Sequence, residues 1–213
     1  MGRGFSRNRG IQESKNEFIV FCDSSNSLSE NFIEKALKCL TSTDNTAVYG
    51  KIVGNKIHND LCSKWREINL FLEVYPEQKE PYEVYSLSTY SVMLRKSHVL
   101  NVGNFDPALR MYEDHELGQR ILKHGCKILF DPALYCTSNR RDNLFQLATR
   151  VDRWYSSSNE GLDIYDFKVL LKTALLIWIK RDIKSKNHSG VIISLSLPFL
   201  ILFQNIFKLG KNF

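Results

Sequence analysis

Short apolar runs separated by polar turns recur along the chain before residue 156. Their length is that of β-strands, and the run at 17–22 is typical of a strand buried in a parallel sheet. The predicted strands are residues 17–22, 47–53, 85–94 and 127–130, the last of them closed by Pro132.

Helical periodicity and capping residues fall between these runs. Ser27 and Glu30 have the spacing of a capping box and predict a helix through about Leu40. The other predicted helices are residues 60–74, a short helix capped by Ser97, residues 114–124 stopped by Gly125, and residues 142–155. Strands that alternate with helices indicate a layered α/β domain.

Composition adds the expectation of one well-packed core. The 213 residues are 43% hydrophobic and 12% aromatic, which is typical of a folded chain. The five cysteines are scattered, with no paired spacing and no histidine cluster, and this pattern indicates reduced thiols in a cytoplasmic protein. The first ten residues are polar and basic, unlike a signal peptide.

The net charge of +6 lies entirely in the C-terminal part of the chain. Residues 165–213 carry eight basic and two acidic side chains, together with two apolar segments at 167–179 and 191–207. The second segment has 17 residues, the lower limit for a membrane-spanning helix. The interleaved apolar runs favour a membrane surface over nucleic acid as the partner. The flanking cations favour a tail that lies on or enters the cytoplasmic leaflet. The alternative is a pair of core helices that covers the sheet.

The stretch at 112–120 gathers carboxylates at the start of a predicted helix. Glu113, Asp114 and Glu116 surround His115, and residues 103–107 form a predicted turn that brings the acids to the edge of the sheet. A carboxylate in such a place is able to accept a proton from a substrate hydroxyl. The stretch indicates group transfer to a hydroxyl, and simple capping of the helix by acids is the alternative.

Four blocks of the sequence follow a pattern known from one family. Residues 4–11 are similar to an ARNxG helix, and residues 17–25 to a strand that ends in Asp-x-Asp. Residues 94–125 are similar to an acceptor-side half that contains the acidic pair, and residues 150–154 have the form [Q/R]xxRW. On these motifs the chain resembles the family 2 glycosyltransferases over residues 2–155.

The resemblance implies an α/β fold with a GT-A-like (Rossmann-like) mixed sheet flanked by helices. It implies a partial GT-A glycosyltransferase domain at 1–160. A helical, apolar and basic tail that associates with a membrane is expected at 161–213. The family's first strands, which hold the base and ribose, have no counterpart here. We therefore expect a fragment, a pseudoenzyme or a chain completed by another polypeptide, with an exposed sheet edge that favours homo-oligomers.

The resemblance also assigns chemical roles. Asp114 matches the catalytic base, and Glu113 matches the acid before it, which orients the base or the acceptor. Arg7 matches a position that faces the nucleotide, where a guanidinium pairs with phosphate oxygens, and Asn8 belongs to the same substrate-binding motif.

Two further assignments carry an open alternative. Arg153 and Trp154 match residues that line the acceptor or diphosphate site, and ordinary packing of an amphipathic helix explains them equally well. Asp23 matches the first acid of a metal-binding pair, but Ser25 stands in place of the second. A weakened site for Mn²⁺ or Mg²⁺ is expected, and the alternative is that Asp23 only ends a strand.

These features together predict an inverting glycosyltransferase that moves a sugar from a nucleotide-diphosphate donor to a hydroxyl acceptor, a glycan or glycolipid. We expect it to work in polysaccharide or glycolipid biosynthesis, in the cytoplasm at the inner face of an anionic membrane. The alternative is a catalytically impaired protein of the same fold that acts as a membrane-surface interaction module. A glycoside hydrolase is disfavoured because its two carboxylates flank the sugar, whereas Glu113 and Asp114 are adjacent.

Overall fold

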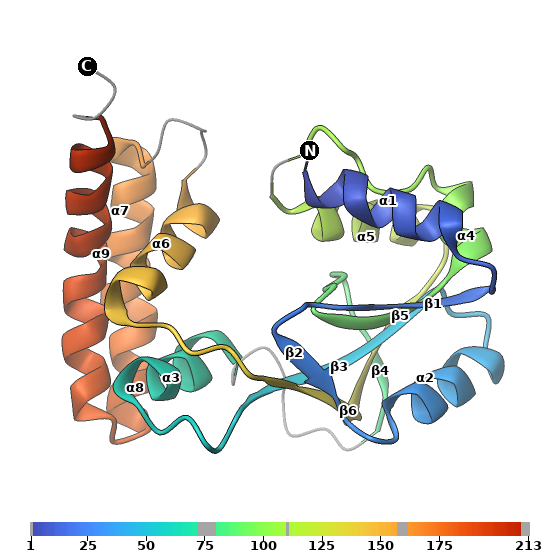
Figure 1. Cartoon of the computed structure of the whole chain (residues 1–213), viewed down its shortest axis with the longest axis horizontal. Helices are drawn as coiled ribbons and strands as arrows, with labels where there is room; N and C mark the ends of the chain where they lie inside the picture. Colours follow the sequence, from blue (N-terminus) through green and yellow to red (C-terminus); the bar gives the residue numbers. More distant parts are fainter. Residues whose placement is uncertain (1, 72–79, 110, 157–161, 210–213) are drawn as a thin grey trace. The chain divides into compact units, whose positions relative to one another are not determined.

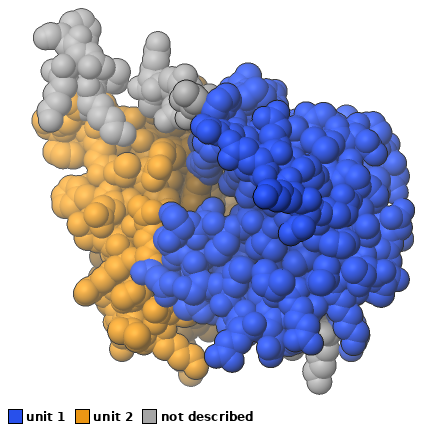
Figure 2. All heavy atoms as spheres, turned by 45° about the vertical axis from the view of Figure 1, so that its right-hand side comes forward, with its two compact units in different colours: residues 1–53, 75–139 blue, residues 54–74, 140–213 orange. Residues whose placement is uncertain are grey.

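The computed structural model describes residues 2–71, 80–109, 111–156 and 162–209. The chain forms two compact units, coloured blue and orange in Figure 2. The first unit contains Met1–Val53 and Tyr75–Asn139, and the second contains Gly54–Val74 and Arg140–Phe213. The predicted division into a transferase domain at 1–160 and a membrane-associating tail at 161–213 concerns function and stays a prediction.

The first unit is built on a mixed sheet flanked by helices (Figure 1). Within the described residues its six strands follow the order β1-β5-β3-β6-β2, and β4 pairs with β6. The strands are β1 (Phe18–Cys22), β2 (Asn26–Leu28), β3 (Ala47–Gly54), β4 (Tyr82–Glu83), β5 (Ser91–Arg95) and β6 (Ile128–Ser138). The helices of this unit are α1 (Arg3–Glu13), α2 (Phe32–Thr41), α4 (Lys96–Asn101) and α5 (Glu113–Lys123).

Alternating side chains of the strands divide the first unit into two apolar layers. Helices α1, α4 and α5 lie on one face of the sheet and α2 on the other (Figure 1). Val48 of β3 packs with Phe32 and Leu40 of α2. Its neighbours Ala47 and Tyr49 pack in the layer under the other three helices. The predicted α/β class is confirmed by this arrangement.

Strong local signals gave correct elements. The prediction at 47–53 corresponds to β3. The prediction at 60–74 corresponds to α3 (Leu61–Arg66), which continues as the π-helical turn η1 (Glu67–Phe71), and its last three residues, 72–74, lie outside the described residues. The prediction at 114–124 corresponds to α5, and Gly125 follows it with a left-handed φ of 75°, as a helix-ending glycine does.

The start of α2 was predicted wrongly. Ser27 and Glu30 do not open a helix, because residues 26–28 form β2 and pair with β6. The Ser27 hydroxyl accepts a hydrogen bond from Asn139 at 2.7 Å, and α2 begins at Phe32. A pairing partner more than a hundred residues away thus decided the conformation of this segment.

Three strand predictions also need correction. β1 is not a buried parallel strand, because it lies at one end of the strand order and pairs antiparallel with β5. The strand expected at 85–94 is confined to β5, since the preceding loop faces α5 through polar contacts. β6 continues through Pro132 to Ser138, so this proline does not close the strand.

The second unit is helical. Its helices after α3 and η1 are α6 (Leu144–Tyr155), α7 (Ile164–Thr173), η2 (Ala174–Trp178), α8 (Ile179–Lys184) and α9 (His188–Leu209). Trp65 and Trp178 meet edge to face at 5.0 Å in its core, beside Leu147, Leu197 and Ile201. The prediction of a helical, apolar C-terminal part is confirmed.

Helix α9 is long and apolar enough to cross a membrane by length and composition. Residues 188–207 have a mean hydropathy of 2.0. One side of the helix nevertheless packs in the core through Ile193, Leu197 and Ile201. Its polar side chains also bind inward: Ser194 donates to Asp182 at 2.6 Å, and Asn205 donates to Asp152 at 2.8 Å. In the second unit α9 therefore has one packed side and one open apolar side.

Candidate functional site

The acidic pair predicted from the sequence lies at the N-terminus of α5, and α1 holds its first member. Glu113 is buried with a 2% exposed side chain, and Arg7 of α1 donates to its carboxylate at 2.5 Å. The Arg3 guanidinium lies 3.8 Å from the same oxygen. The Arg7 guanidinium also stacks over Phe105 at 5.4 Å. A buried carboxylate requires such a partner, so α1 and α5 are fixed to each other by this ion pair.

Asn8 fixes α1 to the turn that precedes α5. Its amide nitrogen donates to the Phe105 carbonyl at 2.7 Å, and its amide oxygen accepts from the Phe105 N–H at 3.0 Å. A Cβ at Gly4 would lie 2.7 Å from the carbonyl oxygen of Asp106, so only glycine permits this approach of helix to turn. The motif residues of α1 thus form the support of the predicted turn at 103–107.

Arg120 holds the same turn from the side of α5. It donates to the Asn104 carbonyl at 2.5 Å and to that of Val102. Glu116, one helical turn earlier, binds the Arg120 guanidinium at 2.6 Å, and this hydrogen bonding raises the pKa of Arg120. Glu116, which has no role by resemblance, therefore positions the arginine that holds the turn.

The backbone is strained where the turn enters α5. Tyr112, the residue before Glu113, has a φ of 60°, and Asn104 has a φ of 62°. A bulky residue rarely adopts this left-handed conformation, and such strain persists only where the surroundings enforce it. Here the buried Glu113 and the Arg120 contacts fix the two ends of the segment, so the acids are presented in one defined orientation.

Asp114 faces the loop before β5 and is half-buried. Its Oδ2 accepts from the Thr89 hydroxyl at 3.1 Å and from the Thr89 N–H at 3.3 Å. Its Oδ1 accepts from the His115 N–H at 2.9 Å. Oδ2 thus accepts two hydrogen bonds and Oδ1 accepts one, so Oδ1 retains a lone pair that is able to accept a proton.

Asp23 reaches the same loop from the sheet. It follows β1 directly and is exposed, and its N–H donates to the Tyr90 carbonyl at 3.1 Å. Tyr90 is the neighbour of Thr89, which binds Asp114. The antiparallel pairing of Cys22 with Ser91 places Asp23, the next residue, beside Tyr90. The structure therefore brings Asp23 and Asp114 to adjacent residues of one loop.

The metal-ligand set around Asp23 is small. In the described ranges, no group of three or more His, Cys, Asp or Glu side chains is placed to hold a metal ion. Ser25 and Asn26 follow Asp23 in the turn, and the Asn26 amide donates to the Tyr90 carbonyl at 3.2 Å. One carboxylate with neutral oxygens suits a hard cation that takes most of its ligands elsewhere.

Arg153 and Trp154 lie near the end of α6, in the second unit. Arg153 is exposed and Trp154 is half-buried. The arrangement around Asp114 is formed within the first unit. The substrate-binding role of Arg153 and Trp154 stays a prediction.

Sequence reasoning missed several residues of this arrangement. Thr89 belongs to none of the four sequence motifs. Its role follows only from the packing of the loop before β5 on α5, where it binds Asp114. Glu116 and Arg120 have the i,i+4 spacing of a helical ion pair, which is visible in the sequence. The strain at Tyr112 depends on tertiary contacts and leaves no sequence signal.

Comparison with known proteins gives a family and a fold. Residues 1–157 match the family model described as "Glycosyltransferase like family 2". Among solved structures, 126 chains match. One of them, described as "Crystal structure of GalNAc-T7 with UDP, GalNAc and Mn2+", aligns with a TM-score of 0.50 at 14% identity. The alignment covers 97% of this chain but 44% of that structure, and it shows the GT-A fold. No curated protein matches the sequence.

Proposed function

The chain belongs to the family 2-like glycosyltransferases, and from this premise we propose that it transfers a sugar from a nucleotide-diphosphate donor to a hydroxyl acceptor with inversion of the anomeric carbon. The observation that carries the proposal is Asp114, half-buried, held by Thr89 and placed at the same loop as Asp23. Such a carboxylate is suited to remove the acceptor proton as the oxygen attacks.

A single base is consistent with direct displacement. The acceptor oxygen attacks the anomeric carbon while the diphosphate departs from the opposite side, so no covalent sugar intermediate is needed. The sugar acquires oxocarbenium character in the transition state, as it does in glycoside hydrolysis. The adjacent Glu113 is buried and paired with Arg7, so we assign it to positioning.

The first-unit residues Arg7 and Asn8 act in this proposal by holding the base. The sequence resemblance assigns them to substrate binding, but both side chains have partners inside the protein: Glu113 for Arg7 and the Phe105 backbone for Asn8. Arg153 and Trp154 remain the candidates for contact with the acceptor or the diphosphate.

The donor is a nucleotide sugar, and a divalent cation assists its binding. The similar solved structure contains UDP and Mn²⁺ by its description. Asp23 is the residue of this chain that would hold Mn²⁺ or Mg²⁺, with Ser25 and Asn26 nearby. Bound there with the donor, the ion would neutralise charge on the departing diphosphate. Because Ser25 stands in place of the second acid of the motif, we expect the protein to bind the cation weakly without the donor.

The cellular setting belongs to the same proposal. The open apolar side of α9 and the basic C-terminal part are suited to the cytoplasmic face of an anionic membrane. A transferase held there would act on a glycan or glycolipid acceptor in polysaccharide or glycolipid biosynthesis.

Replacement of the base tests the proposed function. The full chain is assayed with a panel of nucleotide-diphosphate sugars and glycan acceptors, by release of the nucleoside diphosphate. Asp114→Asn is expected to lower kcat by about 10²–10⁴-fold, because general-base catalysis contributes that much. The matched control is Asp44→Asn, at an exposed aspartate of the same unit, and it should keep wild-type turnover. Equal turnover in both variants would refute the assignment of the base.

A non-catalytic interaction module is the second candidate. Ser25 in place of the second acid and the absence of a three-ligand metal group among the described residues favour it. Calorimetry with UDP and GDP, with and without Mn²⁺, separates the two. Metal-dependent nucleotide binding supports the enzyme, and no nucleotide binding together with vesicle binding supports the module.

A further inference from the structure

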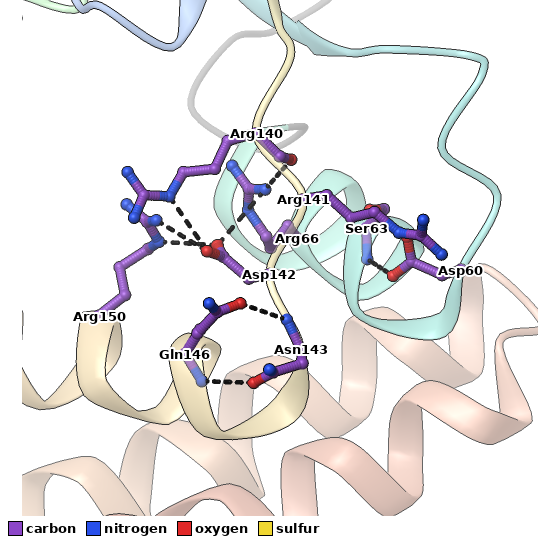
Figure 3. Close-up of polar contacts among 9 residues, drawn as sticks. All are labelled: Asp60, Ser63, Arg66, Arg140, Arg141, Asp142, Asn143, Gln146 and Arg150. Carbon is purple, nitrogen blue, oxygen red and sulfur yellow. Dashed lines mark hydrogen bonds and ion pairs between the residues drawn. The ribbon is translucent and has the colours of Figure 1, made fainter.

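Three arginines of the second unit surround one buried carboxylate (Figure 3). The Asp142 side chain is 1% exposed. Arg150 binds it with two parallel hydrogen bonds of 3.0 Å, and Arg140 donates to it at 3.0 Å. The Arg66 guanidinium lies 3.5 Å away and is buried as well. One negative charge thus faces three positive charges, two of which are largely removed from water.

A fourth arginine extends the cluster (Figure 3). The Arg141 guanidinium lies 3.3 Å from Asp60, and its side chain is 70% exposed. Asp60 is already engaged, because it caps α3 by accepting from the Ser63 N–H at 3.0 Å. Four guanidinium groups therefore meet two carboxylates, and the local excess is two positive charges.

The neighbouring charges shift the pKa of the two buried side chains Arg66 and Asp142. Burial lowers the pKa of Arg66, and Asp142 opposes this while Arg150 and Arg140 lower it further. Burial alone would raise the pKa of Asp142, but hydrogen bonds from Arg150 and Arg140 bring it below its usual value. Asp142 therefore stays ionised and is fully used in binding the arginines.

A cavity of about 560 Å³ opens beside this cluster. It is lined by Asp60, Leu61, Cys62 and Gln146 and by residues 141–144. Its size is that of a small-molecule site. One side carries Arg141 and the N-terminal turn of the 12-residue helix α6, whose N–H groups add positive partial charge. The remaining lining includes the apolar side chains Leu61 and Leu144.

We propose that this cavity binds the phosphate or diphosphate group of a ligand whose adjoining part is apolar. The guanidinium fork matches phosphate oxygens in two parallel bonds, and the bound anion would neutralise the excess charge. Arg141 is the arginine that lines the cavity and is exposed, while Arg66 and Arg150 supply the positive field behind it. Leu61, with 57% of its surface exposed, offers a wall to the apolar part.

This inference rests on the second unit alone and does not require the chemistry proposed for Asp114. If that chemistry is also correct, the ligand is a phosphate-bearing acceptor or product. Asp114→Asn should lower the rate of transfer by about 10²–10⁴-fold and leave anion binding at this cavity unchanged. Failure of one proposal is therefore distinguishable from failure of the other.

The test is calorimetric titration of the full chain with inorganic pyrophosphate and with farnesyl diphosphate, without divalent cations. Arg141→Ala is expected to weaken both by about tenfold or more, as loss of a charged hydrogen bond does. The matched control is Arg9→Ala in the first unit: Arg9 is 71% exposed and is paired with Glu13 at 2.8 Å. It removes the same charge at the same exposure and should leave both affinities unchanged.

The ligand's apolar part is tested separately. Leu61→Ser should weaken farnesyl diphosphate and spare pyrophosphate if the anion is carried by a lipid. If farnesyl diphosphate and pyrophosphate bind equally and both depend on Arg141, the site takes a soluble phosphate. Arg140→Ala is the second arginine variant and removes another positive charge from the cluster around Asp142. Circular dichroism checks that each variant is folded. Absence of binding, or affinities unaffected by either arginine variant, would overturn the inference.

Discussion

Glu113 and Asp114 are neighbours with opposite surroundings, and this difference separates their roles. Glu113 is buried and its oxygen is bound by Arg7, whereas Asp114 is half-buried and bound by neutral donors. Two carboxylates in unlike environments commonly divide chemistry between them. The buried one is suited to structure, and the more open one is suited to proton transfer.

The Arg7–Glu113 pair allows a prediction about stability. Arg7→Met leaves a buried carboxylate with only the more distant Arg3, so the free energy of unfolding should fall by about 3 kcal/mol. The double variant Arg7→Met/Glu113→Leu should recover much of the loss, because no uncompensated charge remains. Urea unfolding measures both values.

The matched control for this pair is the exposed ion pair of Arg9 with Glu13. Arg9→Met should change the unfolding free energy by less than about 1 kcal/mol, since exposed pairs contribute little. A loss in Arg7→Met no larger than in Arg9→Met would contradict the positioning role of the pair.

The residues of the site were predictable from the sequence, but their partners were not. Asp114 and Asp23 carry motif signals because their chemistry needs carboxylates. Their common loop arises from the pairing of β1 with β5 and from the packing of Thr89 on α5, both of which join distant parts of the chain. No local pattern encodes such contacts.

At the scale of elements, local signals predicted helices and strands correctly, and contacts between distant parts of the chain explain the errors. α5 was predicted within one residue at each end because acids start it and Gly125 stops it. The start of α2 and the extent of β6 were missed because β2 forms only by pairing with β6. Capping residues such as Ser27 are equally common in turns, and only the distant strand decides between the two.

Helix α9 gives a prediction at this scale. Ser194 accepts from Trp65 at 2.8 Å and donates to the fully buried Asp182, which also accepts from Asn69 and Asn187. Ser194→Val leaves the Trp65 N–H without this acceptor and removes a donor to Asp182. The unfolding free energy should fall by about 2 kcal/mol.

Denaturant unfolding followed by tryptophan fluorescence measures this loss. The control is Ser196→Val, two residues along the same helix, where the hydroxyl donates only to the Ile193 carbonyl and the residue is half-exposed. It should change stability by less than about 0.5 kcal/mol. Equal effects at both serines would show that α9 is not fixed by its inward polar contacts.

At the scale of the whole molecule, the second unit combines an open apolar side with an excess of basic residues. Phe199, Phe203 and Phe207 of α9 are exposed. Phe203 meets Phe207 at 4.3 Å, and Phe199 meets the half-buried Phe167 of α7 at 6.0 Å. Monomeric soluble proteins rarely expose large contiguous apolar patches. The excess of basic residues after position 164 adds attraction to anionic lipid.

The resulting prediction is binding to vesicles through these rings. The full chain should sediment with vesicles that contain phosphatidylglycerol, and less so at high salt, because salt screens the basic residues. Phe199→Ser/Phe203→Ser should release most of the protein, since each exposed ring offers apolar area to the bilayer interface. The matched control, Ile57→Ser, changes an isolated residue that is 84% exposed and should sediment like the wild type. A protein that self-associates through this side would instead stay off the vesicles. Its mass in ultracentrifugation would depend on concentration, and the double variant would remove this dependence. That result would assign the apolar side to a second copy of the chain.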